Sequence, residues 1–212
     1  MTHILEVLIM GPIQNNTILF GHADSKTIAV VDPADEPTPI INCAKRLGRT
    51  IEAVLITHHH YDHIAGVDLL KAQIPDIKVM ASERCAELCT DGNATLSAFS
   101  TGIEIFIQKP NVILKDEIPF HVAGVKVIPH IVPGHAEGQM IYYAETLNTI
   151  FSGDTLFAGG VGISHLPGGN HEALVSTLKK LLPKFNPDTR VIPGHDEETT
   201  VGVELRTNPY IQ

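Results

Sequence analysis

The sequence predicts an α/β fold in which two mixed β-sheets pack face to face and helices cover the outer faces. Two observations favour this arrangement. Both halves of the chain run from strands to a helix, a strand and a further helix, and they hold more strand pairs than a doubly wound fold would have. The 212 residues, 43% of them hydrophobic, are enough for one sizeable core, so we expect a single domain over residues 1–212.

The first half of the chain predicts two rounds of strands and helices. Pro39 fits the first turn of a helix and Gly48 suits its end, while Ser82 is a good N-terminal cap for a shorter helix. Apolar runs and turn residues indicate the other boundaries. The expected strands are 4–10, 16–20, 26–32, 51–57 and 77–81, and the expected helices are 37–48, 63–73 and 82–89.

The second half predicts mainly short strands. Residues 91–102 are polar, small and glycine-containing, which indicates a loop. Asn170 is a good cap for a helix over about 171–183, and a short helix is expected after Asp196. The expected strands are 104–107, 111–115, 118–122, 124–132, 140–144, 148–153 and 189–194, with a hairpin between the fifth and sixth.

Composition excludes several classes of partner. Fifteen Lys and Arg against 24 Asp and Glu give a net charge of −9, which argues against nucleic acid and anionic membrane surfaces. No apolar run reaches the ~18 residues of a membrane span. The first residues lack a basic region and Glu6 interrupts their apolar run, so we expect a strand there instead of a secretion signal. A cytoplasmic location with reduced cysteines follows as an expectation.

A histidine cluster follows the buried strand 51–57. His58, His60, Asp62 and His63 offer four potential ligands within six residues. In an extended segment His58 and His60 point to the same side, and Asp62 and His63 come at the turn into the next helix. Imidazole and carboxylate groups suit zinc, iron or manganese. The alternative, a histidine-rich surface loop, is disfavoured because a solvated loop after a buried strand more often carries Gly, Asn and Lys.

Three further polar residues occur in matching settings. Pro133-Gly134-His135, Ser152-Gly153-Asp154 and Pro193-Gly194-His195 each follow a β-rich run. The glycine beside each one lets the backbone turn and aim the next side chain. Together with the cluster, they predict a metal site built from distant parts of the chain.

With these motifs the sequence resembles the metallo-beta-lactamase superfamily over essentially its whole length. The resemblance implies an αββα sandwich and a metallo-hydrolase domain with two divalent metal ions at one edge, zinc being expected while iron and manganese stay open. It assigns catalytic roles to Asp62 and Asp154. By position it places His58, His60 and His135 on one metal, Asp62, His63 and His195 on the other, and Asp154 between the two.

Segments 152–174 and 193–211 resemble the glyoxalase II branch, the hydroxyacylglutathione hydrolases, in its short bacterial form, as does the loop 93–98. The resemblance implies cleavage of a thioester such as S-lactoylglutathione by a hydroxide held between the metals. Where that branch carries an Arg and then a Thr/Ser-Asp pair after the second glycine, this chain has Ile163, Ser164 and His165 after Gly162. The long members also have a C-terminal helical domain with basic glutathione contacts, and this chain shows no counterpart after His195, so the thiol carrier stays open.

Thioester cleavage also suits the chemistry of such a site. A thiolate, whose thiol has a pKa of about 8.5, leaves without prior protonation. A positive metal centre attracts an anionic substrate, so the expected partner is a small anionic thioester. The alternative is a mononuclear iron sulfur oxygenase of the persulfide dioxygenase type, and a third hypothesis is a di-iron electron-transfer protein. His165 and His171, which flank a glycine-rich loop, stay open as outer contacts of the site.

Overall fold

The computed structural model describes residues 3–212 and contains two six-stranded sheets. The first sheet has the order β1 (His3–Met10), β2 (Asn15–His22), β3 (Thr27–Val31), β4 (Thr50–Leu55), β5 (Lys78–Ser82), β6 (Val112–Leu114). The second has the order β14 (Thr199–Thr200), β13 (Arg190–Pro193), β10 (Thr149–Gly153), β9 (Met140–Ala144), β8 (Val125–Ile131), β7 (Phe120–Val122). A small separate hairpin joins β11 (Leu156–Phe157) to β12 (Gly160–Val161).

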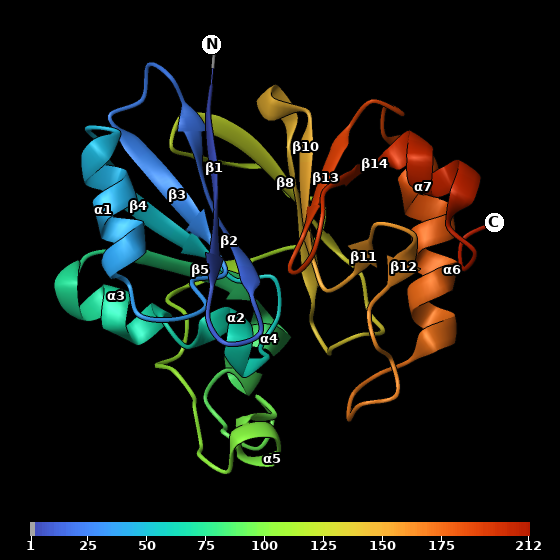
Figure 1. Cartoon of the computed structure of the whole chain (residues 1–212), viewed down its shortest axis with the longest axis horizontal. Coiled ribbons are helices and arrows are strands. Elements are labelled where there is room, and N and C mark those ends of the chain that lie inside the picture. Colours follow the sequence, from blue (N-terminus) through green and yellow to red (C-terminus); the bar gives the residue numbers. More distant parts are fainter. Residues whose placement is uncertain (1–2) are drawn as a thin grey trace.

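Helices lie on the outer sides of both sheets. The first sheet is covered by α1 (Thr38–Arg46) and α3 (Val67–Gln73), and the second by α6 (His171–Leu181) and α7 (Val201–Thr207), as Figure 1 shows. The shorter helices α2 (Tyr61–Ile64), α4 (Glu83–Leu88) and α5 (Ser97–Thr101) lie toward one end of the sandwich. The predicted sandwich of two mixed sheets with outer helices is therefore confirmed. Within residues 3–212, no helix has the length and apolar character required to span a membrane.

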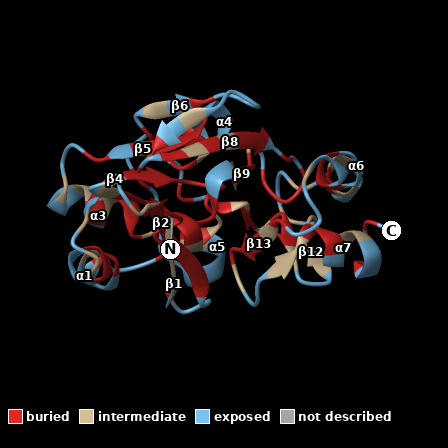
Figure 2. Cartoon of the chain, turned by 90° about the horizontal axis from the view of Figure 1, so that it is seen from above, coloured by how far each residue is buried: buried red, intermediate tan, exposed pale blue. Residues whose placement is uncertain are grey.

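The core consists of one layer between the sheets and one under each set of helices. Between the sheets, Phe20 and Phe151 pack with ring centroids 4.9 Å apart, and the hydroxyl of buried Tyr142 donates a 2.6 Å hydrogen bond to the carbonyl of Ile56. Figure 2 shows this buried interior between the layers. The hydrogen bond joins the second sheet to the residues just before the histidine cluster.

Strand direction decides which loops meet. Strand β4 is parallel to β3 and β5, and β10 is parallel to β13. Because β8 and β10 are both antiparallel to β9, they also run in the same direction as each other. The segments that follow β8, β10 and β13 therefore leave their sheet at one common edge.

Three local expectations were wrong. The helix expected over 63–73 is interrupted at Gly66, where a Cβ would lie 2.1 Å from the carbonyl oxygen of Asp35. The expected strand 104–107 has no strand partner and is anchored instead by the amide of Ile107, which donates to the carbonyl of Cys89. The expected loop 91–102 contains α5, which begins after Leu96 in the left-handed conformation.

Candidate metal centre

The fold brings all seven predicted ligand residues together at one end of the sandwich. His58 and His60 follow β4, Asp62 and His63 lie in α2, His135 follows β8, Asp154 follows β10, and His195 follows β13. They form three overlapping groups in which the candidate ligand atoms lie within 4.8 Å of one another. Strand ends from both sheets thus supply one site.

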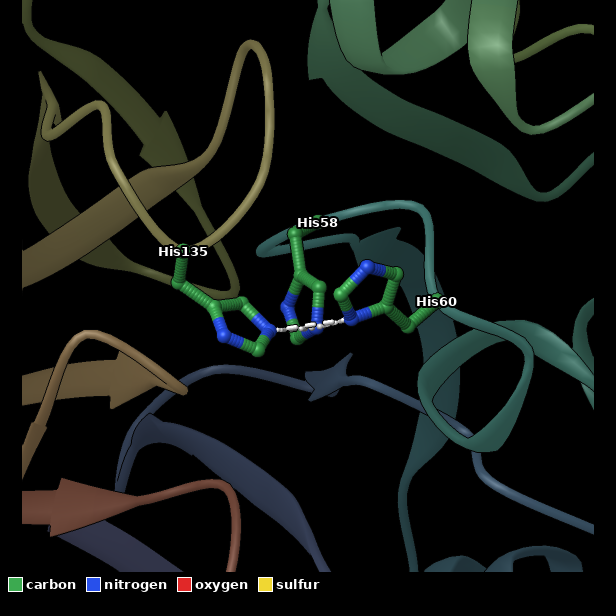
Figure 3. Close-up of side chains that lie close together, drawn as sticks. All are labelled: His58, His60 and His135. Carbon is green, nitrogen blue, oxygen red and sulfur yellow. Dashed lines mark hydrogen bonds between the residues drawn. The ribbon is translucent and has the colours of Figure 1, made fainter. Parts of the chain in front are cut away.

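The first group consists of three buried imidazoles that point toward one another (Figure 3). His135 Nε2 lies 3.2 Å from His58 Nε2 and 2.9 Å from His60 Nδ1, and the last two atoms are 3.1 Å apart. These separations are close to the ~3.3 Å edge of a tetrahedron with metal–nitrogen bonds of 2.0–2.1 Å. The imidazoles therefore have the spacing of ligands to a shared cation.

Outward hydrogen bonds leave the inward nitrogens of His58 and His135 without protons. His135 Nδ1 donates 2.7 Å to the carbonyl of Ile163. His58 Nδ1 lies 3.1 Å from Thr57 Oγ1, whose own proton goes to Asp32, so the histidine is the donor. Since a neutral imidazole carries a single N–H, the Nε2 lone pairs of both rings face the centre of the group. Such a donor set fits a bound metal ion.

The second group combines two histidines and a carboxylate with Asp154. Asp62 Oδ2 lies 3.1 Å from His195 Nε2 and 3.5 Å from His63 Nε2. Asp154 Oδ1 lies 3.3 Å from His63 Nε2, while its other oxygen, Oδ2, lies 3.7 Å from His135 Nε2. The Asp154 carboxylate thus stands between the two groups, and its buried Oδ1 has no hydrogen-bond partner among the described residues.

Asp32 orients this group from behind, and the sequence interpretation missed it. Its Oδ2 accepts a 2.9 Å hydrogen bond from His63 Nδ1 and a 2.6 Å bond from Thr57 Oγ1, and its Oδ1 accepts from the Thr57 amide. A carboxylate behind a histidine fixes which ring nitrogen is free to bind a metal. The available signal was that Asp32, like the ligands, ends a strand of the sheet.

Asn16 positions His195 and was also missed. Its side-chain amide donates to the carbonyls of Pro193 and Asp196, and its backbone amide donates to the carbonyl of Gly194. His195 Nδ1 donates to the carbonyl of Ile13, which leaves Nε2 facing Asp62. The turn between β1 and β2 therefore holds the His195 loop of the other sheet.

Two of the predicted glycines have clear physical reasons. Gly153 has a φ of +48° and approaches Thr57 so closely that a Cβ would lie 2.4 Å from its hydroxyl. At Gly194 a Cβ would lie 2.4 Å from Asp154 Oδ1 and 2.6 Å from the His63 ring. The absence of a side chain at these positions lets the ligand loops pack against each other.

Burial and neighbouring charges shift the pKa values of the two ligand groups in different directions. Burial and then the neighbouring histidines hold the pKa values of His58 and His60 well below the ordinary value. Burial opposes ionisation of Asp154, but the charges of His63, His135 and His195 outweigh it and keep that pKa low. Burial lowers the pKa of His63, but the charges of Asp62, Asp154 and Asp32 outweigh it and raise that pKa well above the ordinary value. Metal binding at His63 therefore displaces a proton, whereas His58 and His60 are already neutral.

The site opens into a cleft of about 530 Å³. Its lining includes His60, Asp62, His135, Asp154 and His195 from the two groups. The remaining lining comes from the β1–β2 turn, Tyr61 of α2, the region around α5, the β11–β12 hairpin with the segment that follows it, and Asp196. A small molecule can therefore reach the ligand side chains.

Comparison with known proteins identifies the fold family. The model of the metallo-beta-lactamase superfamily matches residues 10–195. The chain belongs to the metallo-beta-lactamase superfamily. Among its relatives in this superfamily, a probable metallo-hydrolase, YqgX of Bacillus subtilis, is 31% identical over 95% of this chain and 94% of its own length. The hydroxyacylglutathione hydrolase GloC of Haemophilus influenzae is 27% identical over 98% and 97%.

Two solved structures superpose along nearly the whole chain. The BLEG-1 B3 metallo-beta-lactamase gives a TM-score of 0.92 at 31% identity, covering 99% of this chain and all of that one. TTHA1623 in a di-iron-bound form gives 0.80 at 34% identity, covering 97% and 99%. The resemblance found in the sequence is confirmed at the level of the family and the fold.

The other histidines and cysteines considered as site residues lie outside the two candidate ligand groups. His165 and His171 are exposed, and His171 is hydrogen-bonded to Ser164, so no contact with the described ligand groups supports an outer role for them. Cys85 and Cys89 are fully buried on α4, with sulfur atoms 3.8 Å apart. The hydrogen bond with the Cys89 thiol and burial raise the pKa of Cys85 well above the ordinary value, which keeps it in the unreactive thiol form.

Proposed function

We propose that this chain is a metal-dependent hydrolase that holds two divalent cations and cleaves thioesters. His58, His60 and His135 would hold one cation, Asp62, His63 and His195 the other, and Asp154 would bridge them. The observation that carries the proposal is the position of Asp154, whose two oxygens face different ligand groups. When bound, the cations supply an activated water and a Lewis acid for the substrate carbonyl.

The chain's own groups prepare the site for this chemistry. Asp32 and the carbonyls of Ile13 and Ile163 fix the ring nitrogens of His63, His195 and His135 that face inward. Asp62 and Asp154 stay ionised and supply negative charge to balance the cations, because the histidine charges near them outweigh the cost of burial. No reorientation of these groups is needed when a substrate enters.

A thioester is the substrate class that requires no proton donor for the leaving group from the rest of the cleft. A departing thiolate needs no proton donor, whereas an amine leaving group does. Outside the ligand groups, the polar side chains of the described lining are Tyr61, Ser100 and Asp196. The hydroxyacylglutathione hydrolase among the relatives makes S-lactoylglutathione the first substrate to test.

The test combines metal analysis with turnover. Protein purified without chelator is expected to contain two divalent ions per chain and to release free thiol from S-lactoylglutathione or another thioester. Asp154→Asn is expected to lose at least about 100-fold in kcat/KM while its circular dichroism spectrum is retained. If the protein contains one iron per chain and consumes oxygen with glutathione persulfide, the proposed function is wrong and the chain is a sulfur oxygenase. If it hydrolyses β-lactams but no thioester, the chain is a lactamase.

A further inference from the structure

Beyond the ligand groups, the walls of the metal cleft are mostly apolar. Six of the nine remaining lining side chains are apolar, and two of them are large side chains that are about half exposed. Ile163 and Ile13 are 54% and 47% exposed. The six side chains are those of Ile13, Leu96, Phe157, Val161, Ile163 and Leu166.

Backbone contacts hold two of these side chains close to the ligands. The carbonyl of Ile163 accepts the hydrogen bond from His135 Nδ1, and the carbonyl of Ile13 accepts the one from His195 Nδ1. Gly162, just before Ile163, passes so near Asp154 that a Cβ would lie 1.8 Å from its carbonyl oxygen. The two isoleucines therefore stand on either side of the site, each fixed through its own backbone.

The charges of the cleft do not suit an anionic substrate body. No lysine or arginine occurs among the lining side chains of residues 3–212. Outside the two ligand groups, the charged side chain of this described lining is that of Asp196, an exposed carboxylate. A carboxylate on the substrate would therefore find no cation to pair with along these walls, whereas an aliphatic chain would bury apolar surface.

We infer that this cleft selects its substrate by an unbranched apolar acyl group that packs against Ile13 and Ile163. The inference rests on the proposed thioester hydrolysis and names the part of the substrate that determines specificity. Longer acyl groups gain affinity with each buried methylene, and hydroxyl groups on the acyl chain lose it.

The first experiment measures turnover with one thiol carrier throughout. S-lactoyl-, S-butanoyl- and S-hexanoylglutathione are compared by thiol release with the metal-loaded protein. We expect kcat/KM to rise about two- to fourfold per added methylene and to be lowest for the lactoyl substrate. A lactoyl preference, or equal rates across the series, contradicts the inference.

The second experiment measures binding alone, so that it does not depend on turnover. Calorimetry with S-methyl-, S-butyl- and S-hexylglutathione, thioethers that water does not cleave, is expected to give affinity that rises with chain length. The dimethyl ester of S-hexylglutathione is expected to bind within about twofold of its parent, because the walls offer its carboxylates no partner. Loss of more than about tenfold on esterification would instead indicate ionic recognition of the carrier.

Two serine variants test whether the side chains of Ile13 and Ile163 cause the dependence on chain length. Ile163→Ser and Ile13→Ser each retain the backbone carbonyl and change a side chain that is half exposed, and each is expected to flatten the dependence on chain length. Ile118→Ser is the matched control, since Ile118 is 59% exposed and lies outside the cleft lining. If the protein cleaves no thioester but binds longer thioethers more tightly, the proposed function fails and the apolar cleft stands. Affinity that is independent of chain length overturns the inference whatever the turnover.

Discussion

Four of the five candidate ligand histidines bond through Nδ1 to a group behind them, and the bond from His63 to Asp32 is buried at both ends. Asp32→Asn replaces an obligatory acceptor by an amide that no longer dictates which nitrogen of His63 carries the proton. We expect metal affinity to fall about 10- to 100-fold, measured by competition with a chelator of known affinity. Asp24→Asn, at an exposed carboxylate, is the control. Unchanged affinity in Asp32→Asn would show that the bond does not orient His63.

A side chain at Gly194 would collide with two candidate ligand residues of the site. An alanine there would place its Cβ against Asp154 Oδ1 and the His63 ring. We expect Gly194→Ala to lose at least about 100-fold in activity, because displacements of about 1 Å at a catalytic group have that effect. Gly160→Ala is the matched control, since a Cβ there meets a single atom, Phe157 Cβ at 3.7 Å. Equal activity of the two variants would mean that the His195 loop can shift freely.

The sequence predicted the seven side chains that the fold brings together as candidate ligands, but not the residues behind them. Histidines and aspartates beside glycines at strand ends form a pattern that can be read along the chain. Asp32 follows a strand but has no glycine beside it, and Asn16 lies at the start of β2. Both act through bonds to His63 and to the His195 loop, which lie far away in sequence. Their roles depend on which strand ends meet, and only the fold determines that.

At the scale of elements, the sequence predicted strongly patterned segments better than weak ones. The strands that form the core and the helix α6 lie close to their expected ranges, because burial of one face imposes a regular period on the sequence. The region 91–107 has no such period, and its loop and strand assignments were wrong. There the short helix α5 is held by hydrogen bonds of Thr95 and Ser97 to the carbonyl of Ile105.

Helix α6 provides a test of packing. Leu178 lies on the inner face of α6 and is fully buried against the second sheet. Leu178→Ala is expected to lower the free energy of unfolding by about 2–5 kcal/mol, because it removes buried methyl groups and leaves a cavity. Leu69→Ala, at a leucine on α3 that is 51% exposed, should change it by less than about 0.5 kcal/mol. Equilibrium urea unfolding measures both, and similar effects for the two would contradict the packing of α6.

At the scale of the molecule, the candidate ligands come from both halves of the sandwich. His58, His60, Asp62 and His63 follow the first sheet, while His135, Asp154 and His195 follow the second. The pattern of strands predicted the two sheets, but not their strand order, because equal alternation in many strands leaves their neighbours undetermined. Bound metal ions would therefore link loops of the first sheet to loops of the second sheet at this end of the sandwich.

Metal binding should therefore stabilise the whole chain. A ligand at about 1,000 times its dissociation constant adds about 4 kcal/mol, and each kcal/mol shifts the melting temperature of a chain of this size by about 2–4 °C. We expect excess chelator to lower the melting temperature by at least about 8 °C, measured by circular dichroism. His58→Ala should show a smaller shift, since it retains the group around His63 but not the group of three histidines. An unchanged melting temperature after chelation would show that the two sheets are held together without metal.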